Sequence, residues 1–208
     1  MKKKILISTG GTGGHVIPAS VFYDHLKNDF DVFLSSDERG VKFLNIDKEQ
    51  IKIINTPKLQ NKILLLPFNI LSIIFLTFKS IFFLRKKNID ILISTGGYMS
   101  LPLCFAAKFL KIKIFLFEPN MTMGRANIFF IKLSKKIFCY ANNIKNFPKK
   151  YLGKIVVIGP LLRKKFYSVK LNEKEILKEI KLLIIGGSQG AKFFDHEIKN
   201  SILQLTNK

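Results

Sequence analysis

Cysteine is scarce in this sequence. Cys104 and Cys139 are the two present among 208 residues, and both stand in apolar stretches without the spacing of metal ligands. A sparse pair of this kind is typical of a protein from a reducing compartment. The sequence therefore predicts two buried, reduced thiols.

Acidic residues are also few. The chain has 14 Asp and Glu against 35 Lys and Arg, which gives a formal net charge of +21. Such an excess favours a polyanionic partner, which includes nucleic acid, an anionic membrane surface and phosphorylated substrates. Charge alone does not choose among them, and heavy use of Lys, Ile, Phe and Asn also fits a compositional bias of the source genome.

A signal peptide is not predicted. The start MKKKILIS resembles the basic region of a secretory signal, but the apolar run ends at a glycine-rich stretch. It is shorter than the roughly 7–15 apolar residues that a signal requires. We therefore expect a cytoplasmic protein.

Short apolar runs alternate with helical patterns along most of the chain. The predicted strands are 4–8, 31–35, 51–55, 90–95, 112–117, 136–140, 154–158 and 181–185. The predicted helices are about 17–28, 38–46, 62–87, 101–111, 124–134, 173–180 and 190–205. Continuously apolar, β-branched strands are typical of a parallel sheet covered on both faces. The pattern predicts an α/β, Rossmann-like doubly wound fold that binds its ligands at the carboxyl ends of the strands.

Three glycine-rich turns follow three of the predicted strands. They are STGGTGGH at 8–15, STGGYMS at 94–100 and GGSQGA at 186–191. Where a strand leads into a helix, glycine permits positive φ and the helix N-terminus offers free N–H groups to an anion. A tight turn explains one such stretch equally well, but three together favour a phosphate-binding role. None has the spacing of a P-loop, and the first is not the G-x-G-x-x-G of dinucleotide enzymes.

These turns belong to a longer series of motifs. GGTGGHVIPA, GGYMSLP, FEPNMTMGRAN, GPLLR and GGSQGA follow one another between residue 4 and about residue 200. In this order the sequence resembles the MurG group of glycosyltransferase family 28. Those enzymes add N-acetylglucosamine to undecaprenyl-diphosphate-muramoyl-pentapeptide (lipid I), which forms lipid II in peptidoglycan synthesis. The resemblance implies a GT-B arrangement, in which two Rossmann-like domains face each other across a cleft.

The resemblance implies an inverting, metal-independent transfer from UDP-N-acetylglucosamine, without a cofactor. It also implies two groups of binding residues. Those on the donor side are Thr12, Gly13, Gly14, Asn120, Arg163 and Ser188. Those on the acceptor side, near the lipid diphosphate, are Gly96, Gly97 and Tyr98. Backbone N–H groups, helix dipoles and an arginine would meet the charge of the departing UDP.

Two residues compete for the role of catalytic base. Transfer to a sugar hydroxyl with inversion needs a group that accepts the hydroxyl proton. His15 follows the first glycines, and its imidazole titrates near neutral pH. Glu118 is the acidic residue of the family's H-E-x-N motif and is the rival candidate. A helix cap or diphosphate donor for His15, and a structural carboxylate for Glu118, are the alternatives. His25 and His196 lie in helical stretches, where we expect them to face solvent.

The sequence departs from the family pattern in three places. Phe117 stands where the family usually has the His of H-E-x-N, so a polar group is missing beside Glu118. GPLLR, at 159–163, lacks the usual Asn after its Gly. The uracil-recognition segment, the acidic residue that binds the ribose and the Gln that contacts the sugar have no counterpart in this sequence. We therefore expect the 208-residue chain alone to turn over little substrate.

An apolar segment, ILLLPFNILSIIFLTFKSIFFLRKK at 63–87, is long enough to span a bilayer, which takes about 20 residues. A span would place the predicted strands before and after it on opposite sides of the membrane, although they belong to one sheet. We therefore expect a buried or surface-docked helix. The family has a helix here beside an apolar, basic-rimmed patch. The basic residues that would attract anionic lipids are Lys58, Lys62, Lys79, Arg85, Lys86 and Lys87.

We accordingly expect a peripheral protein on the cytoplasmic face of the inner membrane. Its expected partners are UDP-N-acetylglucosamine, lipid I, anionic lipid and other proteins of cell-wall synthesis. Nucleic acid is not expected, because no recognition motif is present.

The predicted organisation has three parts. Residues 1–160 form an acceptor-side and membrane-side domain, 161–180 a linker, and 181–208 the first strand and helix of a donor-binding domain. Two other functions stay open. One is a membrane-docked acceptor-binding half of a split glycosyltransferase that works with a separate donor-binding subunit. The other is a non-catalytic nucleotide-binding module, which the acceptor-side turn disfavours.

Overall fold

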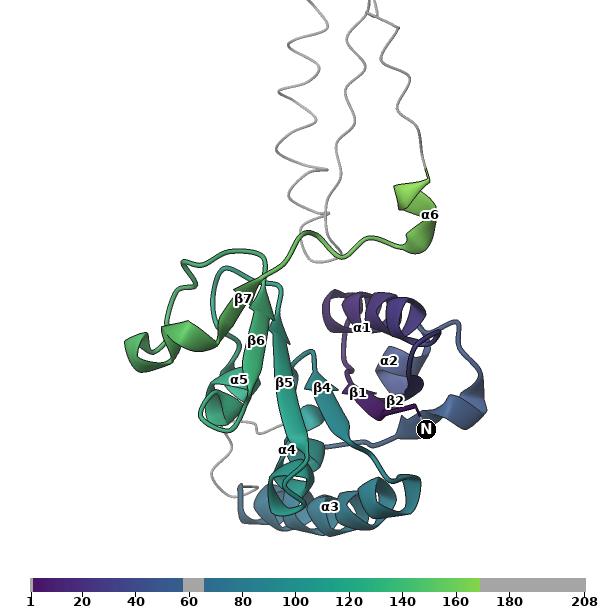
Figure 1. Cartoon of the computed structure of the whole chain (residues 1–208). Coiled ribbons are helices and arrows are strands. Elements are labelled where there is room, and N and C mark those ends of the chain that lie inside the picture. Colours follow the sequence, from purple (N-terminus) through teal and green to yellow (C-terminus); the bar gives the residue numbers. More distant parts are fainter. Residues whose placement is uncertain (1, 58–65, 169–208) are drawn as a thin grey trace, which may run out of the picture. The chain divides into compact units, whose positions relative to one another are not determined.

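A single parallel sheet organises the part of the chain that the structure describes (Figure 1). The structure is a computed structural model that describes residues 2–57 and 66–168, all of them within one compact unit, Met1–Val169. The strands are β1 (Lys4–Ser8), β2 (Asp31–Ser36), β3 (Ile51–Ile53), β4 (Ile91–Ser94), β5 (Lys113–Glu118), β6 (Lys136–Cys139) and β7 (Ile155–Val157). Their order in the sheet is β3-β2-β1-β4-β5-β6-β7. This is the doubly wound α/β fold that the sequence predicts.

The strand order reverses between β1 and β4. From β1 the chain builds outward through β2 to β3, then returns to the other side of β1 and builds outward again from β4 to β7. β1 and β4 pair in parallel, with Ile5 opposite Ile91 and Ser8 opposite Ser94. In open α/β sheets, ligands bind at such a reversal, outside the carboxyl ends of the strands. The turns after β1 and β4 therefore occupy the favoured position.

Helices connect the strands and cover both faces of the sheet. They are α1 (Gly13–Leu26), α2 (Glu38–Val41), α3 (Leu66–Lys87), α4 (Ser100–Phe109), α5 (Arg125–Phe130) and α6 (Lys164–Tyr167). Two 3₁₀ turns, η1 (Lys48–Gln50) and η3 (Lys149–Lys154), add to them. The helix α1 packs on one face of the sheet, while α3, α4 and α5 pack on the other.

Alternate side chains along the central strands feed two hydrophobic cores. In β1, Ile5 and Ile7 pack with Ala19 and Tyr23 of α1, whereas Leu6 points to the core under α3 and α4. All three side chains of β1 are at most 3% exposed. Burial on both faces explains why these strands read as continuous apolar runs.

All seven strands within the described residues were predicted, to within about two residues at each end. The strand predicted at 181–185 and the helices at 173–180 and 190–205 lie outside the described residues. The helix α1 begins at Gly13 rather than near residue 17, so the second half of the first glycine turn is already helical.

Two predicted helices are too long. The helix α2 ends at Val41 instead of residue 46, because the next backbone N–H groups, of Phe43 and Leu44, bond three residues back to Gly40 and Val41. The helix predicted at 124–134 contains α5, which ends at Phe130 and continues as turns. The short α6 and η3 were not predicted.

The prediction of buried thiols is confirmed. Cys104 and Cys139 are both free and buried. Burial raises the pKa of the Cys104 thiol to about 12, although hydrogen bonds with Ser94 and Ser100 oppose it. Burial, with the nearby negative charge of Glu118, raises the pKa of Cys139 to about 11. Both therefore stay protonated at neutral pH and serve as apolar core groups.

The long apolar helix lies on the surface of the sheet domain. β3 and β4, which flank α3 in sequence, belong to the same sheet, as expected. In the described part of the chain, α3 has the length and apolar composition that would suffice to cross a membrane. It packs against α4, yet 17% of its most apolar 18-residue window is buried. The helix is thus surface-lying rather than a buried core helix.

Truncation of a central core side chain tests the two-faced packing. Leu116 of β5 is fully buried beneath α4, so Leu116→Ala should leave a cavity and lower the free energy of unfolding by about 2–5 kcal/mol. Val157→Ala in the edge strand β7, where the side chain is 46% exposed, should cost much less. Urea denaturation of both variants measures the difference, and equal losses would contradict the assignment of the core.

Candidate functional site

The turns after β1 and β4 meet at the reversal of the sheet. The Thr95 N–H donates to the Ser8 carbonyl at 3.0 Å, which extends the β1–β4 pairing by one residue. The Thr95 hydroxyl donates to the hydroxyl of Thr9 at 2.9 Å. Both threonines are fully buried, so their hydrogen bond holds the starts of the two glycine turns together.

His15 links the two turns. It lies in the first turn of α1, and its Nδ1 is 2.7 Å from the carbonyl oxygen of Thr95. A carbonyl oxygen accepts hydrogen bonds and does not donate them, so this contact assigns the proton of a neutral imidazole to Nδ1. The lone pair of Nε2 is then available. The half-buried His15 is thereby oriented as a proton acceptor.

Gly96 leaves room for this arrangement. Its φ is +91°, and a Cβ at this position would lie 3.3 Å from Asn127 Nδ2 and 3.4 Å from His15 Cε1. Any larger residue would strain the backbone and press on the imidazole. The close approach of the β4 turn to α1 therefore depends on glycine.

Glu118 organises the loop after β5. The side chain is 1% exposed and accepts four hydrogen bonds. Its Oε1 accepts from the backbone N–H and side-chain Nδ2 of Asn120, and its Oε2 accepts from the Gly124 N–H at 2.7 Å and Asn127 Nδ2 at 3.1 Å. Two donors on each oxygen occupy the usual lone-pair positions of a carboxylate.

Asn127 lies between this loop and the glycine turn after β4. It is 2% exposed, and its Nδ2 donates to the Phe117 carbonyl and to Glu118. Its Oδ1 is buried without a hydrogen-bond partner among the described residues. The same side chain contacts the space beside Gly96. Asn127 therefore ties α5 to the end of β5 and lies next to the turn after β4.

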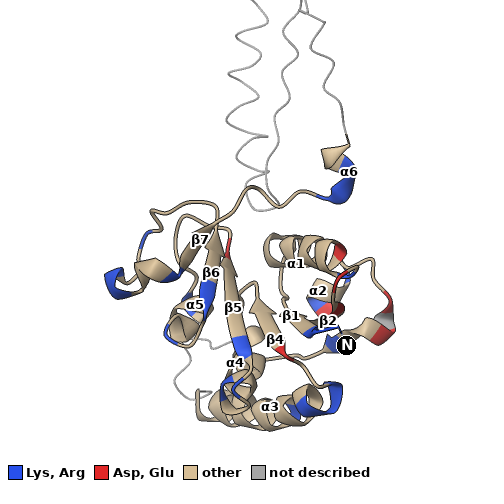
Figure 2. Ribbon diagram, in the orientation of Figure 1, with Lys and Arg blue, Asp and Glu red and all other residues tan. Residues whose placement is uncertain are grey.

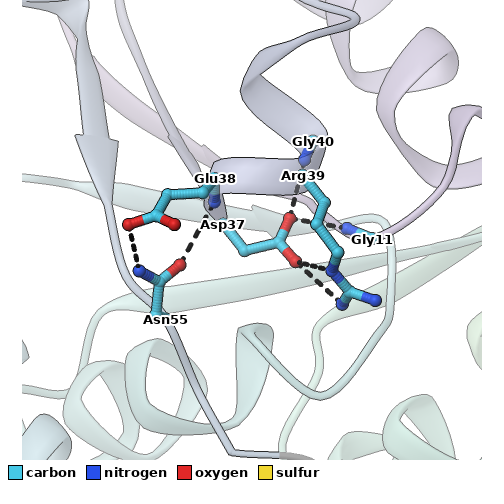
Figure 3. A network of polar contacts seen from close by, with 6 residues as sticks. All are labelled: Gly11, Asp37, Glu38, Arg39, Gly40 and Asn55. Atoms are coloured by element: carbon cyan, nitrogen blue, oxygen red, sulfur yellow. Dashed lines mark hydrogen bonds and ion pairs between the residues drawn. The ribbon is translucent and has the colours of Figure 1, made fainter.

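Asp37 holds the first glycine turn from the other side (Figure 3). One carboxylate oxygen accepts from the backbone N–H groups of Gly11 and Gly40, each at 2.8 Å. The other oxygen pairs with Arg39 at 2.8 and 2.9 Å. Although burial acts to raise the pKa of Asp37, the two N–H groups and the guanidinium outweigh it and lower that pKa below 3.8.

The β2 turn fits against the β1 turn with almost no spare space. A Cβ on Gly10 would lie 2.7 Å from Met99 and 3.0 Å from Asp37 Oδ1, and one on Gly40 would lie 3.1 Å from the Cα of Gly10. Gly10 and Gly11 both have positive φ. The three turns after β1, β2 and β4 are therefore packed into one unit.

The remaining predicted site residues lie at helix ends and in loops. Thr12 is the exposed N-cap of α1, whose side chain makes no capping bond, and Gly13 and Gly14 form the first turn of the helix. Tyr98 follows the second glycine turn and packs against the core under α4.

Asn120 is exposed in the loop that Glu118 holds. Arg163 caps α6, and within residues 2–57 and 66–168 its side chain makes no hydrogen bond or ion pair. Ser188 lies outside the described residues, as does His196.

The expectation that His25 faces solvent is met only in part. The ring is half-buried, its Nε2 lies 3.1 Å from the Leu162 carbonyl oxygen, and Tyr167 packs edge-on against it. His25 therefore anchors the segment before α6 on α1.

Phe117 has a structural explanation. Its side chain is fully buried and makes edge-on contacts with Phe22 of α1 at 5.1 Å and with Tyr140 at 5.5 Å. It points to the face of the sheet that α1 covers. Glu118, the next residue along the strand, points to the other face, where Asn120, Gly124 and Asn127 satisfy it.

Sequence reasoning missed Asp37 and Asn127. Asp37 stands directly after a strand and three residues before a glycine, which is a signal for a side chain that caps a turn. Asn127 lies within the predicted helix at 124–134, and a buried amide there carries no periodic signal. Among the described residues, no cluster of three His, Cys, Asp or Glu side chains could hold a metal ion.

The lowered pKa of Asp37 predicts a stability change with pH. A carboxyl whose pKa falls on folding stabilises the fold above its unfolded value, here 3.8, and loses this contribution as pH falls through the lower folded value. Asp37→Asn keeps the shape but not the charge. It should cost about 1–3 kcal/mol at pH 7, where the charged form accepts the hydrogen bonds.

Urea midpoints between pH 7 and pH 3 measure this effect. The gap between wild type and Asp37→Asn should narrow as pH falls below 3.8. Asp29→Asn, at an exposed position, is the matched control and should show a small, constant difference. A constant gap for Asp37→Asn would contradict the role of its charge.

Comparison with known proteins gives one family match. Residues 5–139 match the model of the glycosyltransferase family 28 N-terminal domain. A Pelagibacter ubique protein named UDP-N-acetylglucosamine–N-acetylmuramyl-(pentapeptide) pyrophosphoryl-undecaprenol N-acetylglucosamine transferase is 58% identical over 99% of the chain. A protein of the same name from Rickettsia bellii is 35% identical over 99% of the chain. The chain spans 57% and 58% of their lengths.

Solved structures agree on the fold. The crystal structure of Acinetobacter baumannii MurG matches with a TM-score of 0.72 and 25% identity, over 97% of this chain and 57% of that one. The UDP-GlcNAc 2-epimerase of Methanocaldococcus jannaschii matches with a TM-score of 0.56 and 16% identity, over 75% of this chain and 45% of that one. The second likeness concerns the fold alone.

Proposed function

The chain belongs to glycosyltransferase family 28, and from this premise we propose that it is the acceptor-side part of an enzyme that transfers N-acetylglucosamine from UDP-N-acetylglucosamine to lipid I. The names of its relatives in Pelagibacter ubique and Rickettsia bellii support these substrates. The observation that carries the proposal is the oriented imidazole of His15 between two glycine turns at the reversal of the sheet.

In the proposed reaction His15 is the base. The acceptor hydroxyl oxygen attacks C1 of the donor sugar, and the new C1–O bond forms as the bond from C1 to the phosphate oxygen of UDP breaks. Nε2 of His15 takes the hydroxyl proton, while the Thr95 carbonyl holds Nδ1–H and stabilises the imidazolium that results. The electron pair of the broken bond leaves with UDP.

The glycine turns would bind diphosphate. Gly13 and Gly14 open α1, where backbone N–H groups and the helix dipole favour an anion, and Thr12 adds an exposed hydroxyl that is not used for capping. We assign these residues to the donor, and Gly96, Gly97 and Tyr98 to the acceptor diphosphate. Arg163 and Ser188 complete the proposed donor group.

Glu118 has a positioning role in this proposal. Four donors occupy its carboxylate and it is almost fully buried, so it has no lone pair to offer a substrate hydroxyl. Its contacts with Asn120 hold that amide at the surface of the loop, where it would contact the donor sugar. These features favour His15 over Glu118 as the base.

Replacement of the imidazole tests the assignment. Residues 1–208 are joined to the part of the Pelagibacter ubique relative that this chain does not cover, and transfer of radiolabelled N-acetylglucosamine to lipid I is measured. Loss of a general base should lower kcat of His15→Gln by about 10²–10⁴-fold with little change in KM.

Ser20→Ala is the control, because Ser20 is also in α1 but its hydroxyl donates to the Ile17 carbonyl of its own helix. It should keep most of the activity. If His15→Gln kept the wild-type kcat, the base would lie elsewhere. If the parent fusion failed to act on lipid I while transferring to another acceptor, the proposed substrate would be wrong.

We also propose that the protein docks on the cytoplasmic face of an anionic membrane through α3. The helix exposes apolar side chains such as Phe68, Leu71 and Phe75, and it ends in Arg85, Lys86 and Lys87. Figure 2 shows this basic end of α3, while acidic residues gather around α2. Apolar residues with neighbouring cations are typical of proteins that lie on a bilayer.

Charge removal tests the docking. Sedimentation with liposomes rich in phosphatidylglycerol should fall when Arg85, Lys86 and Lys87 are replaced by Gln, since each basic residue near such a surface contributes about 1 kcal/mol. A control that replaces Lys145, Lys149 and Lys150, all exposed and outside α3, loses the same charge. The control should bind nearly as wild type; an equal loss would show attraction by net charge alone.

A further inference from the structure

A small polar pocket lies beside the turn after β2. It has a volume of about 370 Å³, and its lining residues are Asp37, Glu38, Arg39, Asn55 and Thr56. These residues follow the carboxyl ends of β2 and β3. In a parallel sheet the carboxyl ends of all strands lie at one edge, where ligands bind. The polar pocket is therefore at the same edge of the sheet as the glycine turns.

Part of the lining forms a closed network (Figure 3). The Asp37 carboxylate is occupied by Arg39 and by two backbone N–H groups. Asn55 Nδ2 donates to Glu38 Oε1 at 2.8 Å, and the Glu38 N–H donates to Asn55 Oδ1 at 3.1 Å. These paired contacts hold α2 against the loop after β3. The walls of the pocket are thus positioned before a ligand arrives.

Three groups on the walls keep unused hydrogen-bonding capacity within the described residues. The Nε and one terminal nitrogen of Arg39 contact Asp37, which leaves three of the five N–H groups of this guanidinium without a partner. Glu38 Oε2 accepts no hydrogen bond there. The Thr56 hydroxyl oxygen is buried and has no partner either. Buried polar atoms without a partner are rare and cost free energy, so this one marks a place where a ligand can donate.

These groups match a ligand that carries both a carboxylate and N–H donors. The free N–H groups of Arg39 suit a carboxylate, whereas the oxygens of Glu38 and Thr56 accept from N–H groups. A diphosphate suits the pocket less well. The pair of Asp37 and Arg39 is neutral, so Glu38 leaves the pocket with a net negative charge. A peptide offers carboxylate and amide N–H groups on one chain.

The acceptor in the proposed reaction carries such a peptide. The names of the relatives in Pelagibacter ubique and Rickettsia bellii include an N-acetylmuramyl-(pentapeptide) group. β2 and β3 are the first and second strands beyond β1, so their ends lie about 5 and 10 Å from the end of β1. Five extended residues span about 17 Å. A pentapeptide on an acceptor held at the glycine turns therefore reaches the polar pocket.

We propose that the polar pocket binds the pentapeptide of the acceptor, with a peptide carboxylate on Arg39 and peptide N–H groups on Glu38 and Thr56. The proposal rests on the proposed function, because it takes lipid I as the acceptor. It adds a peptide-binding site to the turns that we assign to the diphosphates. Since the peptide does not react, the site should act on binding of the acceptor and not on the chemical step.

Binding of a soluble fragment tests the site in the 208-residue chain. The probe is muramoyl-pentapeptide, which has neither the lipid nor the diphosphate, and isothermal titration calorimetry measures its binding. We expect saturable binding of one molecule per chain. The same compound with every carboxylate converted to a carboxamide should bind about tenfold more weakly or worse, the loss typical of a charge-assisted hydrogen bond.

Two variants and a control separate binding from folding. Thr56→Val removes a hydroxyl that has no partner among the described residues, so its urea midpoint should not fall, whereas binding of the fragment should weaken about 2–10-fold. Arg39→Gln should weaken binding about tenfold or more, and it should lower the urea midpoint because it breaks the pair with Asp37. Lys42→Gln is the matched control, since Lys42 is exposed and does not line the pocket.

The outcomes decide the proposal. Weaker binding in Thr56→Val without a loss of stability, while Lys42→Gln binds as wild type, supports it. Absence of saturable binding, equal binding of the amidated compound, or wild-type binding in Thr56→Val would each overturn it.

Kinetics of the fusion distinguish this proposal from the proposed function. Thr56→Val in the fusion should raise KM for lipid I and leave kcat unchanged. If the fusion acts on lipid I with a wild-type KM in both Thr56→Val and Arg39→Gln, the peptide site is wrong and the proposed function stands. If the parent fusion transfers to another acceptor and not to lipid I, the proposed function itself is wrong.

Discussion

The pairing of β1 with β4 is the constraint on which the site depends. It joins strands that are separated by more than eighty residues, and it continues past the sheet through the bond from the Thr95 N–H to the Ser8 carbonyl. Because the register is fixed there, the Thr95 carbonyl lies where the first turn of α1 presents His15. A shift of one residue would invert every side chain of the strand and remove this contact. The order of the strands therefore determines which group the imidazole meets.

Glycine makes the turns compact, and carboxylates make them rigid. Gly10 leaves room for the side chains of Met99 and Asp37, and Gly96 leaves room for those of Asn127 and His15. Asp37 and Glu118 then each gather backbone N–H groups from adjoining turns, those of Gly11 and Gly40 for one and of Asn120 and Gly124 for the other. A buried carboxylate that several N–H groups satisfy costs little and fixes the geometry of all of them. Two acidic side chains of a strongly basic chain thus hold the first glycine turn, which we assign to diphosphate binding, and the loop that carries Asn120.

Much of this fold was predictable because its signals are local. Buried parallel strands read as apolar runs, and the glycine turns after β1 and β4 stand where strand pattern changes to helix pattern. Contacts between turns that are distant in the sequence produce no local sequence pattern. The partners of Asp37 and Asn127, and the contact of His25 with the segment before α6, depend on tertiary packing. The sequence makes Glu118 a candidate base as the acidic residue of the family's H-E-x-N motif, whereas the four donors that occupy its carboxylate come together only in the folded chain. The short extent of α2 was missed because its hydrogen bonds change from i−4 to i−3 within an unbroken helical pattern.

The helices on the two faces of the sheet differ in how much of their apolar surface is buried, and α3 is the one with an excess of exposed apolar side chains. The helix α1 buries Val16, Ala19 and Val21 against the sheet and carries His15 of the candidate site. The helix α3 buries few residues, yet it is apolar around most of its circumference. Exposed Phe and Ile side chains in such number reduce solubility, and a helix that covers a sheet needs only one apolar stripe to face the core. The excess lies on the side away from the core. Core packing does not require that pattern, whereas the docking on a membrane that we propose for α3 would use it.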